Sequence, residues 1–186
     1  MLVDRLLRQG AMTELVGPLS SGRTSLLMLC LRDVTRRGAL AALVDTDHAF
    51  DAASAAAAGV ELARVLWVRA EGRRRDALKA ADLLARCPGF ALVVLDLGES
   101  PPRLPLGAAY RLRLAARRSS VALLIVSARR VIGGAASIAV AARRDRLAWT
   151  GPGAVPRRLA GMRSEFHVVR NQGAPFATAE RVWWTA

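Results

Sequence analysis

The sequence predicts an α/β fold with a central, mainly parallel sheet, helices on its flanks and an antiparallel β extension toward the C-terminal end. Short apolar runs alternate with longer amphipathic stretches as far as Val126, which is the pattern of parallel strands joined by crossover helices. The run Phe90–Leu95, FALVVL, is continuously apolar, as expected of a strand buried on both faces. After Val126 the alternation stops, and three β-like segments follow without helices between them.

The first two thirds of the chain supply the elements of the parallel sheet. Gly38 and Gly59 stand where helices commonly end, and the pair Pro88-Gly89 breaks a third helix. The expected strands are Met12–Val16, Leu40–Val44, Val65–Val68, Phe90–Leu95 and Val121–Val126, and the expected helices are Leu2–Gln9, Arg23–Arg37, Asp51–Ala58, Arg73–Arg86 and Gly107–Arg118.

The last third supplies the antiparallel extension. Its β segments are Ser137–Ala142, Glu165–Arg170 and Thr178–Trp184. Between the first two lies the Gly/Pro/Arg-rich stretch 143–163, which shows little periodicity and is expected to be irregular.

Length and composition favour one globular domain over residues 1–186. The 186 residues are 53% hydrophobic, which excludes a disordered chain. No apolar run approaches the roughly 18 residues of a transmembrane helix, and Asp4, Arg5 and Arg8 interrupt what would be the apolar core of a signal peptide. Cys30 and Cys87 form no disulfide framework or metal-ligand spacing. We expect a reduced, cytoplasmic protein without a membrane partner or bound metal.

Basic residues are concentrated in the second half of the chain. Residues 1–100 carry 13 basic and 12 acidic side chains, whereas residues 101–186, called the basic half below, carry 15 arginines against three acids. Such asymmetry favours a surface for DNA or for an acidic protein partner, although a GC-rich genome would also enrich arginine. The candidate DNA- or partner-binding residues are Arg111, Arg113, Arg117, Arg118, Arg129, Arg130, Arg143, Arg144 and Arg170.

A phosphate-binding motif lies between the first expected strand and the second expected helix. The segment Gly17-Pro-Leu-Ser-Ser-Gly-Arg-Thr-Ser25 has the spacing G-x-x-x-x-G-K-[ST], in which glycines and backbone N–H groups cradle phosphate. Arg23 replaces the lysine, and a planar fork does not reproduce the geometry of a compact ammonium. A Gly/Ser turn that binds nothing is the alternative. The candidate nucleotide-binding residues are Gly17, Ser20, Ser21, Gly22, Arg23, Thr24, Ser25 and Asp96.

Asp96 stands where a magnesium-holding acid belongs, at the end of the FALVVL strand. An ordinary aspartate that caps the following loop is the alternative. Hydrolysis also needs a carboxylate or amide that orients the attacking water, whereas the helix after Val68 opens with the basic segment Glu71-Gly-Arg-Arg-Arg-Asp76. Magnesium and ATP are therefore doubtful cofactors for this chain.

Four segments, in order along the chain, resemble the RecA recombinase family. Thr13–Ser25 is similar to its phosphate-loop block, and Leu43–Val65 to the next block of Asp, His, Ala and Asp with a short helix. Leu78–Asp96 looks like the helix and strand that carry its magnesium-binding aspartate, and Phe166–Glu180, FHVVRNQGAPFATAE, is similar to its C-terminal strands. The resemblance implies a RecA-like core.

Departures from the RecA pattern fall on the residues that handle ATP. The resemblance places Arg23 at the lysine, Arg75 at the catalytic glutamate and Arg129 at the glutamine that senses the γ-phosphate. Arg170 and Gln172 take the places of two lysines that reach a neighbouring subunit's nucleotide. The sequence thus predicts a non-catalytic relative.

The losses make the chain resemble the ImuA family, SulA-related accessory proteins of damage-induced (SOS) mutagenesis. Gly98–Gly107 and Arg130–Ala136 are too short to hold the two DNA-binding loops of RecA. The resemblance implies a role in translesion DNA synthesis, with RecA, the inactive polymerase homologue ImuB and an error-prone DnaE-type polymerase complex as partners and with non-specific DNA contact. A slow, DNA-linked ATPase and a SulA-like cell-division inhibitor are the alternatives.

Overall fold

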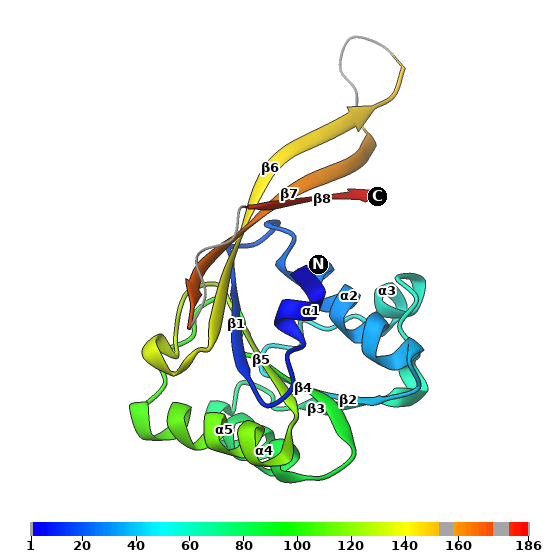
Figure 1. Cartoon of the computed structure of the whole chain (residues 1–186). Helices are drawn as coiled ribbons and strands as arrows, with labels where there is room; N and C mark the ends of the chain where they lie inside the picture. The colour runs from blue at the N-terminus through cyan, green and yellow to red at the C-terminus, as the bar shows by residue number, and fades with distance from the viewer. Residues whose placement is uncertain (1, 153–157, 173–178, 186) are drawn as a thin grey trace.

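The computed structural model describes residues 2–152, 158–172 and 179–185, and its strands form one eight-stranded sheet (Figure 1). The strand order is β3-β2-β4-β5-β1-β6-β7-β8. The first six strands in this order are parallel to one another, and the last two pairings, β6 with β7 and β7 with β8, are antiparallel. The predicted fold class is confirmed.

The parallel strands and the helices fall close to their expected positions. The strands are β1 (Met12–Val16), β2 (Leu40–Asp45), β3 (Val65–Arg69), β4 (Phe90–Asp96) and β5 (Ala122–Ser127). The helices are α1 (Leu2–Leu6), α2 (Arg23–Arg36), α3 (Ala52–Ala57), α4 (Arg74–Arg86) and α5 (Leu106–Ser119), with short 3-10 turns at Leu62–Arg64 and Gly133–Ala135. The main difference among them is α1, which ends three residues before the predicted Gln9.

Alternating side chains of the central strands divide the core into two layers. Leu92 and Val94 of β4 face the cluster that includes α1, α2 and α3, whereas Val93 and Leu95 face the cluster with α4 and α5. Figure 1 shows these helix groups on opposite faces of the sheet. Burial on both faces explains why β4 reads as a continuous apolar run. No helix among the described residues is long and apolar enough to cross a membrane.

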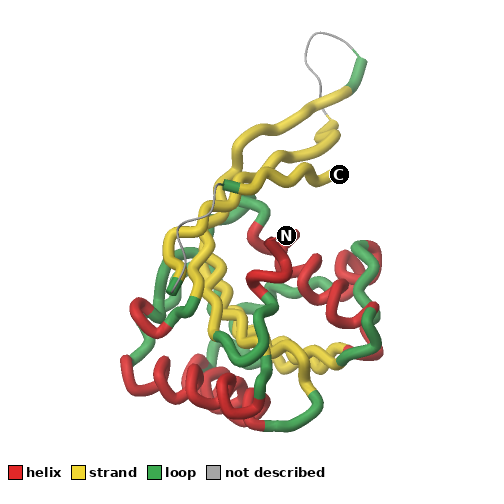
Figure 2. Tube along the Cα trace, viewed as in Figure 1, coloured by secondary structure: helices red, strands yellow, loops and turns green. Residues whose placement is uncertain are grey.

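The C-terminal strands differ from the prediction in two ways. β6 (Ile138–Thr150) is parallel to β1, so the antiparallel extension begins with β7 (Arg158–Asn171) and continues with β8 (Glu180–Thr185). The described part of the stretch 143–163 is not irregular, because β6 and β7 pair along it and project beyond the helices (Figure 2). Thr178, the expected start of the last strand, lies outside the described residues.

Cross-strand charge pairing explains why this arginine-rich stretch forms strands. Glu165 of β7 lies opposite Arg143 of β6 and Arg181 of β8. Its carboxylate accepts hydrogen bonds from Arg143 at 2.7 Å and from the Nε of Arg181 at 3.1 Å, and it lies 3.0 Å from Nε2 of His167. The Arg143 bond, with those of His167 and Arg181, lowers the pKa of Glu165 to about 2. Opposite charges facing each other across strands stabilise the pairing.

Glu165→Gln is expected to destabilise the protein at neutral pH and to lose this effect in acid. Because folding lowers the pKa of Glu165 from 4.5 to about 2, the carboxylate stabilises the fold above pH 4.5 and loses that contribution as the pH falls toward 2. Urea unfolding between pH 7 and pH 3 measures the difference. The control Glu71→Gln removes an exposed carboxylate that lies 3.6 Å from Arg73, and we expect little change. A pH-independent loss in Glu165→Gln would contradict this account.

Candidate functional site

The phosphate-loop motif joins the carboxyl end of β1 to the start of α2, as the sequence predicts. The ends of the parallel strands here are called the carboxyl edge of the sheet, and the opposite ends the amino edge. Gly17 has no room for a side chain, since an added Cβ would lie 2.6 Å from Oγ of Ser21 and 2.7 Å from the carbonyl oxygen of Ala142. Gly22 has a φ of 90°, a conformation that glycine adopts readily. The loop therefore has the tight turns of a phosphate-binding loop.

The C-terminal strands pack directly against this loop. A Cβ on Gly22 would lie 2.1 Å from Oγ of Ser164 and 2.9 Å from Nε1 of Trp184. Trp184 donates a hydrogen bond to Ser164 at 2.9 Å, and its ring contacts Phe166 edge-on at 6.3 Å between centroids. Sequence reasoning missed the contacts of Ser164 and Trp184 with Gly22, because they join residues more than 140 positions apart.

Arg23, at the lysine position, turns its side chain into the protein rather than toward solvent. Nη1 donates to the carbonyl oxygen of Gly17, and Nη2 forms an ion pair with Glu99. The Arg23 side chain is only 7% exposed, whereas that of Glu99 is 37% exposed. Nε of Arg23 is buried without a hydrogen-bond partner among the described residues. The guanidinium is thus held by the loop's own backbone and by the segment after β4.

Asp96 lies near this guanidinium at the carboxyl end of β4. Burial raises the pKa of Asp96 to about 6, the hydrogen bond from the Gly98 amide and the charge of Arg23 oppose the rise, and the charges of Asp45 and Asp47 add to it. The Gly98 amide donates to Oδ1 of Asp96 at 2.9 Å. Asp96 therefore caps the turn that follows β4, and the nearby cation is the Arg23 guanidinium.

The Asp45 carboxylate likewise accepts hydrogen bonds from other residues of the protein. Its Oδ1 accepts from the Ala49 amide at 3.1 Å, and its Oδ2 from the Phe50 amide at 3.0 Å and from the Trp67 indole at 3.3 Å. Among the described residues, no group of three or more His, Cys, Asp or Glu side chains could hold a metal ion.

The site does not match the donor set that would hold a magnesium nucleotide. In an intact loop the lysine reaches the phosphates and the Ser/Thr hydroxyl and strand-end acid hold Mg²⁺. Here Thr24 is exposed, but the only cation of the motif is bonded to Gly17 and Glu99. The cavity lined by residues 18–25 and Met162 measures about 110 Å³, below the 300–1,000 Å³ or so of ordinary ligand pockets. Ser21 is buried and Ser20 and Ser25 line this cavity.

The other two arginines at ATP-handling positions do not approach the loop in any described contact. Arg75 is exposed in the first turn of α4, where its neighbour Arg74 donates to the Ser100 carbonyl at 3.0 Å. Arg129 donates to the Pro101 carbonyl at 2.9 Å. Both Arg74 and Arg129 therefore brace the segment that also supplies Glu99.

The nine arginines proposed for DNA or partner binding do not form one surface. Arg129 and Arg130 follow β5 at the carboxyl edge, whereas Arg113 and Arg117 line a pocket with Gly10 and Ser137, which precede β1 and β6 at the amino edge. The cause is the direction of α5, which returns the chain from the end of β4 to the start of β5.

Several of these arginines already have partners within the protein. Arg111 lies 3.7 Å from Asp82, Arg170 donates to the Ala136 carbonyl at 2.8 Å, and Arg143 pairs with Glu165. Arg130 pairs at 3.0 Å with Glu14, a fully buried carboxylate of β1 that also accepts from the Ile132 amide. Arg118 and Arg144 are exposed. Sequence reasoning missed Glu14, whose signal is an acid within an otherwise apolar strand.

Gly22→Ala is expected to destabilise the protein more than Gly38→Ala. Both glycines have positive φ, 90° and 80°, so each substitution carries a backbone cost of about 1–2 kcal/mol. Only at Gly22 does the new Cβ collide, with Ser164, whereas nothing lies within 4 Å at Gly38. We expect the collision to add about 1–3 kcal/mol to the loss for Gly22→Ala. Equal losses in urea unfolding would show that the C-terminal strands do not pack on the loop.

Asp96→Asn is expected to remove a pH dependence of stability. Folding raises the pKa of Asp96 from 3.8 to about 6, so the folded state binds the proton more tightly and the free energy of unfolding falls as the pH rises between these values. The variant should gain stability relative to wild type across this window, by up to about 3 kcal/mol, and the difference should be constant above it. Urea unfolding from pH 4 to pH 8 measures this, and a pH-independent difference would contradict the assignment.

Comparisons with known proteins agree with this architecture. The family model of the RecA N-terminal domain matches residues 6–101. Protein RecA of Borrelia hermsii is 38% identical over 88 residues, which cover 47% of this chain and 24% of the relative. Protein RecA of Nostoc punctiforme is 38% identical over 90 residues, which cover 48% of this chain and 25% of the relative. The matched segment thus spans about a quarter of these curated relatives.

A solved structure extends the likeness beyond the matched sequence. The crystal structure of the RadB recombinase superposes with a TM-score of 0.66 at 18% identity, covering 96% of this chain and 91% of that chain. At this identity the likeness concerns the fold alone. The family-model match, together with the phosphate-loop position between β1 and α2, leads to one conclusion: this chain belongs to the RecA N-terminal domain family.

Proposed function

We propose that the chain is a non-catalytic RecA-family accessory protein that acts in damage-induced translesion DNA synthesis by binding partners rather than by hydrolysing ATP. The observation that carries the proposal is the buried side chain of Arg23, which is bonded to the Gly17 carbonyl and to Glu99. A cation held in this way does not reach a bound triphosphate without breaking its ion pair with Glu99, which is costly because the guanidinium is buried.

The rest of the site supports the same proposal. Phosphoryl transfer to water requires a group that orients the water and charges that stabilise the transferring phosphoryl group. The resemblance assigns the first role to position 75, where an exposed arginine lies, and the γ-phosphate contact to position 129, where an arginine donates to Pro101. Neither arginine is an acceptor for a water proton.

A slow ATPase is the second candidate, and one observation favours it. Thr24 and Asp96 keep the residue types and positions of a magnesium site, at the start of α2 and the end of β4. This candidate requires Arg23 to leave Glu99 when nucleotide binds, so the two functions differ in a measurable turnover.

An apolar groove on the C-terminal strands supports a role in binding protein partners. It measures about 450 Å³, is lined by Leu147, Trp149, Leu159 and Trp184 among others, and Trp149 is 52% exposed. Exposed apolar grooves of this kind mark interaction sites. Arg144 at its rim would favour an acidic partner segment. The resemblance to the ImuA family supports RecA, ImuB and the DnaE-type polymerase complex as the proposed partners, with DNA contacted non-specifically.

The wild-type protein is expected to show no MgATP turnover above background, with or without single-stranded DNA. The physical reason is that Arg75 stands where the resemblance places the group that orients water, and that Arg23, the cation of the loop, is paired with Glu99. A coupled phosphate-release assay compares wild type with Thr24→Ala, which removes the hydroxyl that would hold magnesium. Turnover by the wild type that Thr24→Ala abolishes would instead establish the slow ATPase.

The double variant Trp149→Ala/Leu159→Ala is expected to lose capture of ImuB or RecA from the same organism. Its matched control is Leu83→Ala/Leu106→Ala, which removes two leucines that are 69% and 66% exposed and lie outside the groove. Pull-down with purified partners measures retention. Equal retention by both variants would exclude the groove as the partner surface, and equal loss would indicate a non-specific effect of reduced surface hydrophobicity.

A further inference from the structure

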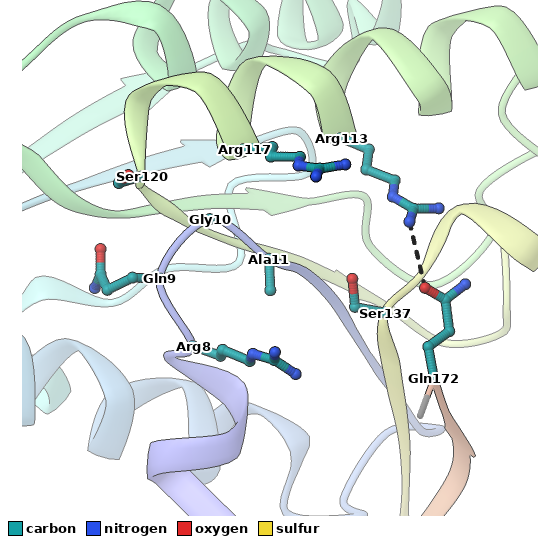
Figure 3. Close-up of a pocket in the computed structure, with 9 residues that line it drawn as sticks. All are labelled: Arg8, Gln9, Gly10, Ala11, Arg113, Arg117, Ser120, Ser137 and Gln172. Atoms are coloured by element: carbon teal, nitrogen blue, oxygen red, sulfur yellow. Dashed lines mark hydrogen bonds between the residues drawn. The ribbon is translucent and has the colours of Figure 1, made fainter. Parts of the chain in front are cut away.

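We propose that the amino edge of the sheet carries a phosphate-binding pocket, separate from the phosphate-loop motif. The pocket measures about 460 Å³ and is lined by Arg8, Gln9, Gly10, Ala11, Arg113, Arg117, Ser120, Ser137 and Gln172 (Figure 3). This inference goes beyond the proposed function, because that proposal depends on Arg23 at the opposite edge of the sheet.

The strand pairing explains how residues distant in sequence come together here. β1 is paired in parallel with both β5 and β6, so the residues that precede these three strands, Gly10-Ala11, Ser120 and Ser137, lie side by side. β7 runs back along β6, with Asn171 opposite Ile138, and this places Gln172 at the same edge. β1 is five residues long, so at about 3.3 Å per residue the pocket lies roughly 16 Å from the phosphate loop.

Three arginines give the pocket its charge. Arg113 and Arg117 are one helical turn apart on α5, and Arg8 follows α1. Figure 3 shows the side chains of all three arginines extending in the direction of Ser137 and Gln172, whereas Gln9 points the opposite way. None of the described residues that line the pocket is acidic. Such an arrangement attracts an anion from several directions at once.

The pocket arginines also keep their donors free, unlike many other arginines of the chain. Arg113 donates to Oε1 of Gln172 at 3.3 Å, but the side chains of Arg8 and Arg117 have no hydrogen bond or ion pair to any described residue. By contrast, Arg130, Arg143 and Arg181 pair with glutamates. The free guanidinium donors, with the hydroxyl of Ser137, are therefore available to a ligand.

The chemistry of the lining selects phosphate as the ligand group. Guanidinium forks bind phosphate oxygens through two parallel hydrogen bonds. None of the described residues that line the pocket is aromatic, so none of them would stack on a base, and the recognition that they provide would depend on the phosphate. A phosphate of a nucleic-acid backbone and a free phosphorylated compound share this chemistry.

The test compares two double variants that lose the same charge. Arg8→Gln/Arg117→Gln removes the two free pocket arginines without breaking any described side-chain contact, and Arg103→Gln/Arg146→Gln removes two exposed arginines outside the pocket that likewise have no described side-chain partner. Binding is measured by fluorescence anisotropy with labelled oligothymidylate and by calorimetry with inorganic pyrophosphate. Thermal unfolding of each variant shows that it is folded.

We expect the pocket variant to bind oligothymidylate about tenfold more weakly than the wild type. The slope of log affinity against log salt concentration should fall by about 0.7 for each contact with the single strand that is lost. We expect little change in the control variant. Loss with oligothymidylate alone assigns the site to a nucleic-acid backbone, and loss with both probes assigns it to phosphate compounds in general. An equal loss of affinity in the two double variants would show that binding depends only on net charge, and this would overturn the proposal. Unchanged binding of both probes by the pocket variant would also overturn the proposal. The proposal would fail in the same way if the pocket variant lost affinity only for an acidic peptide such as polyglutamate.

Discussion

The buried cation of Arg23 is the constraint on which the carboxyl edge of the sheet depends. A guanidinium that is removed from water needs acceptors close to it, and the loop supplies the Gly17 carbonyl while the segment after β4 supplies Glu99. Asp96 lies within reach of the same charge. Through these intramolecular contacts, Arg23 connects the segment that follows β1 with the segment that follows β4. In an active relative these two segments would hold phosphate and magnesium.

The packing of the C-terminal strands reinforces this closed arrangement. Ser164 and Trp184 lie against Gly22 with no space for another atom, and the contacts of Arg143, His167 and Arg181 with the Glu165 carboxylate hold the three strands in register. The amino edge is different, because Arg8, Arg113 and Arg117 pair with no carboxylate among the described residues. The chain therefore combines a carboxyl edge whose loop cation is paired within the protein with a basic amino edge that is free to bind.

The sequence predicts the parallel strands and the phosphate-loop motif well because these depend on local patterns. The apolar run of β4 and the glycine spacing of residues 17–22 reflect burial and backbone conformation at those positions. It does not predict the partner of Arg23, since Glu99 meets it only through tertiary structure. For the same reason it misses the continuation of β6 and β7 through arginines paired across strands.

Titration calorimetry with MgATP on wild type and on Arg23→Lys tests the central claim most directly. Lysine is a shorter point charge that makes no planar, two-sided contact, so it should release the bridge between Gly17 and Glu99 and restore a cation to the loop. We expect Arg23→Lys to bind MgATP at least about tenfold more tightly than the wild type, a difference of about 1.4 kcal/mol. Wild-type binding as tight as that of Arg23→Lys would contradict this expectation.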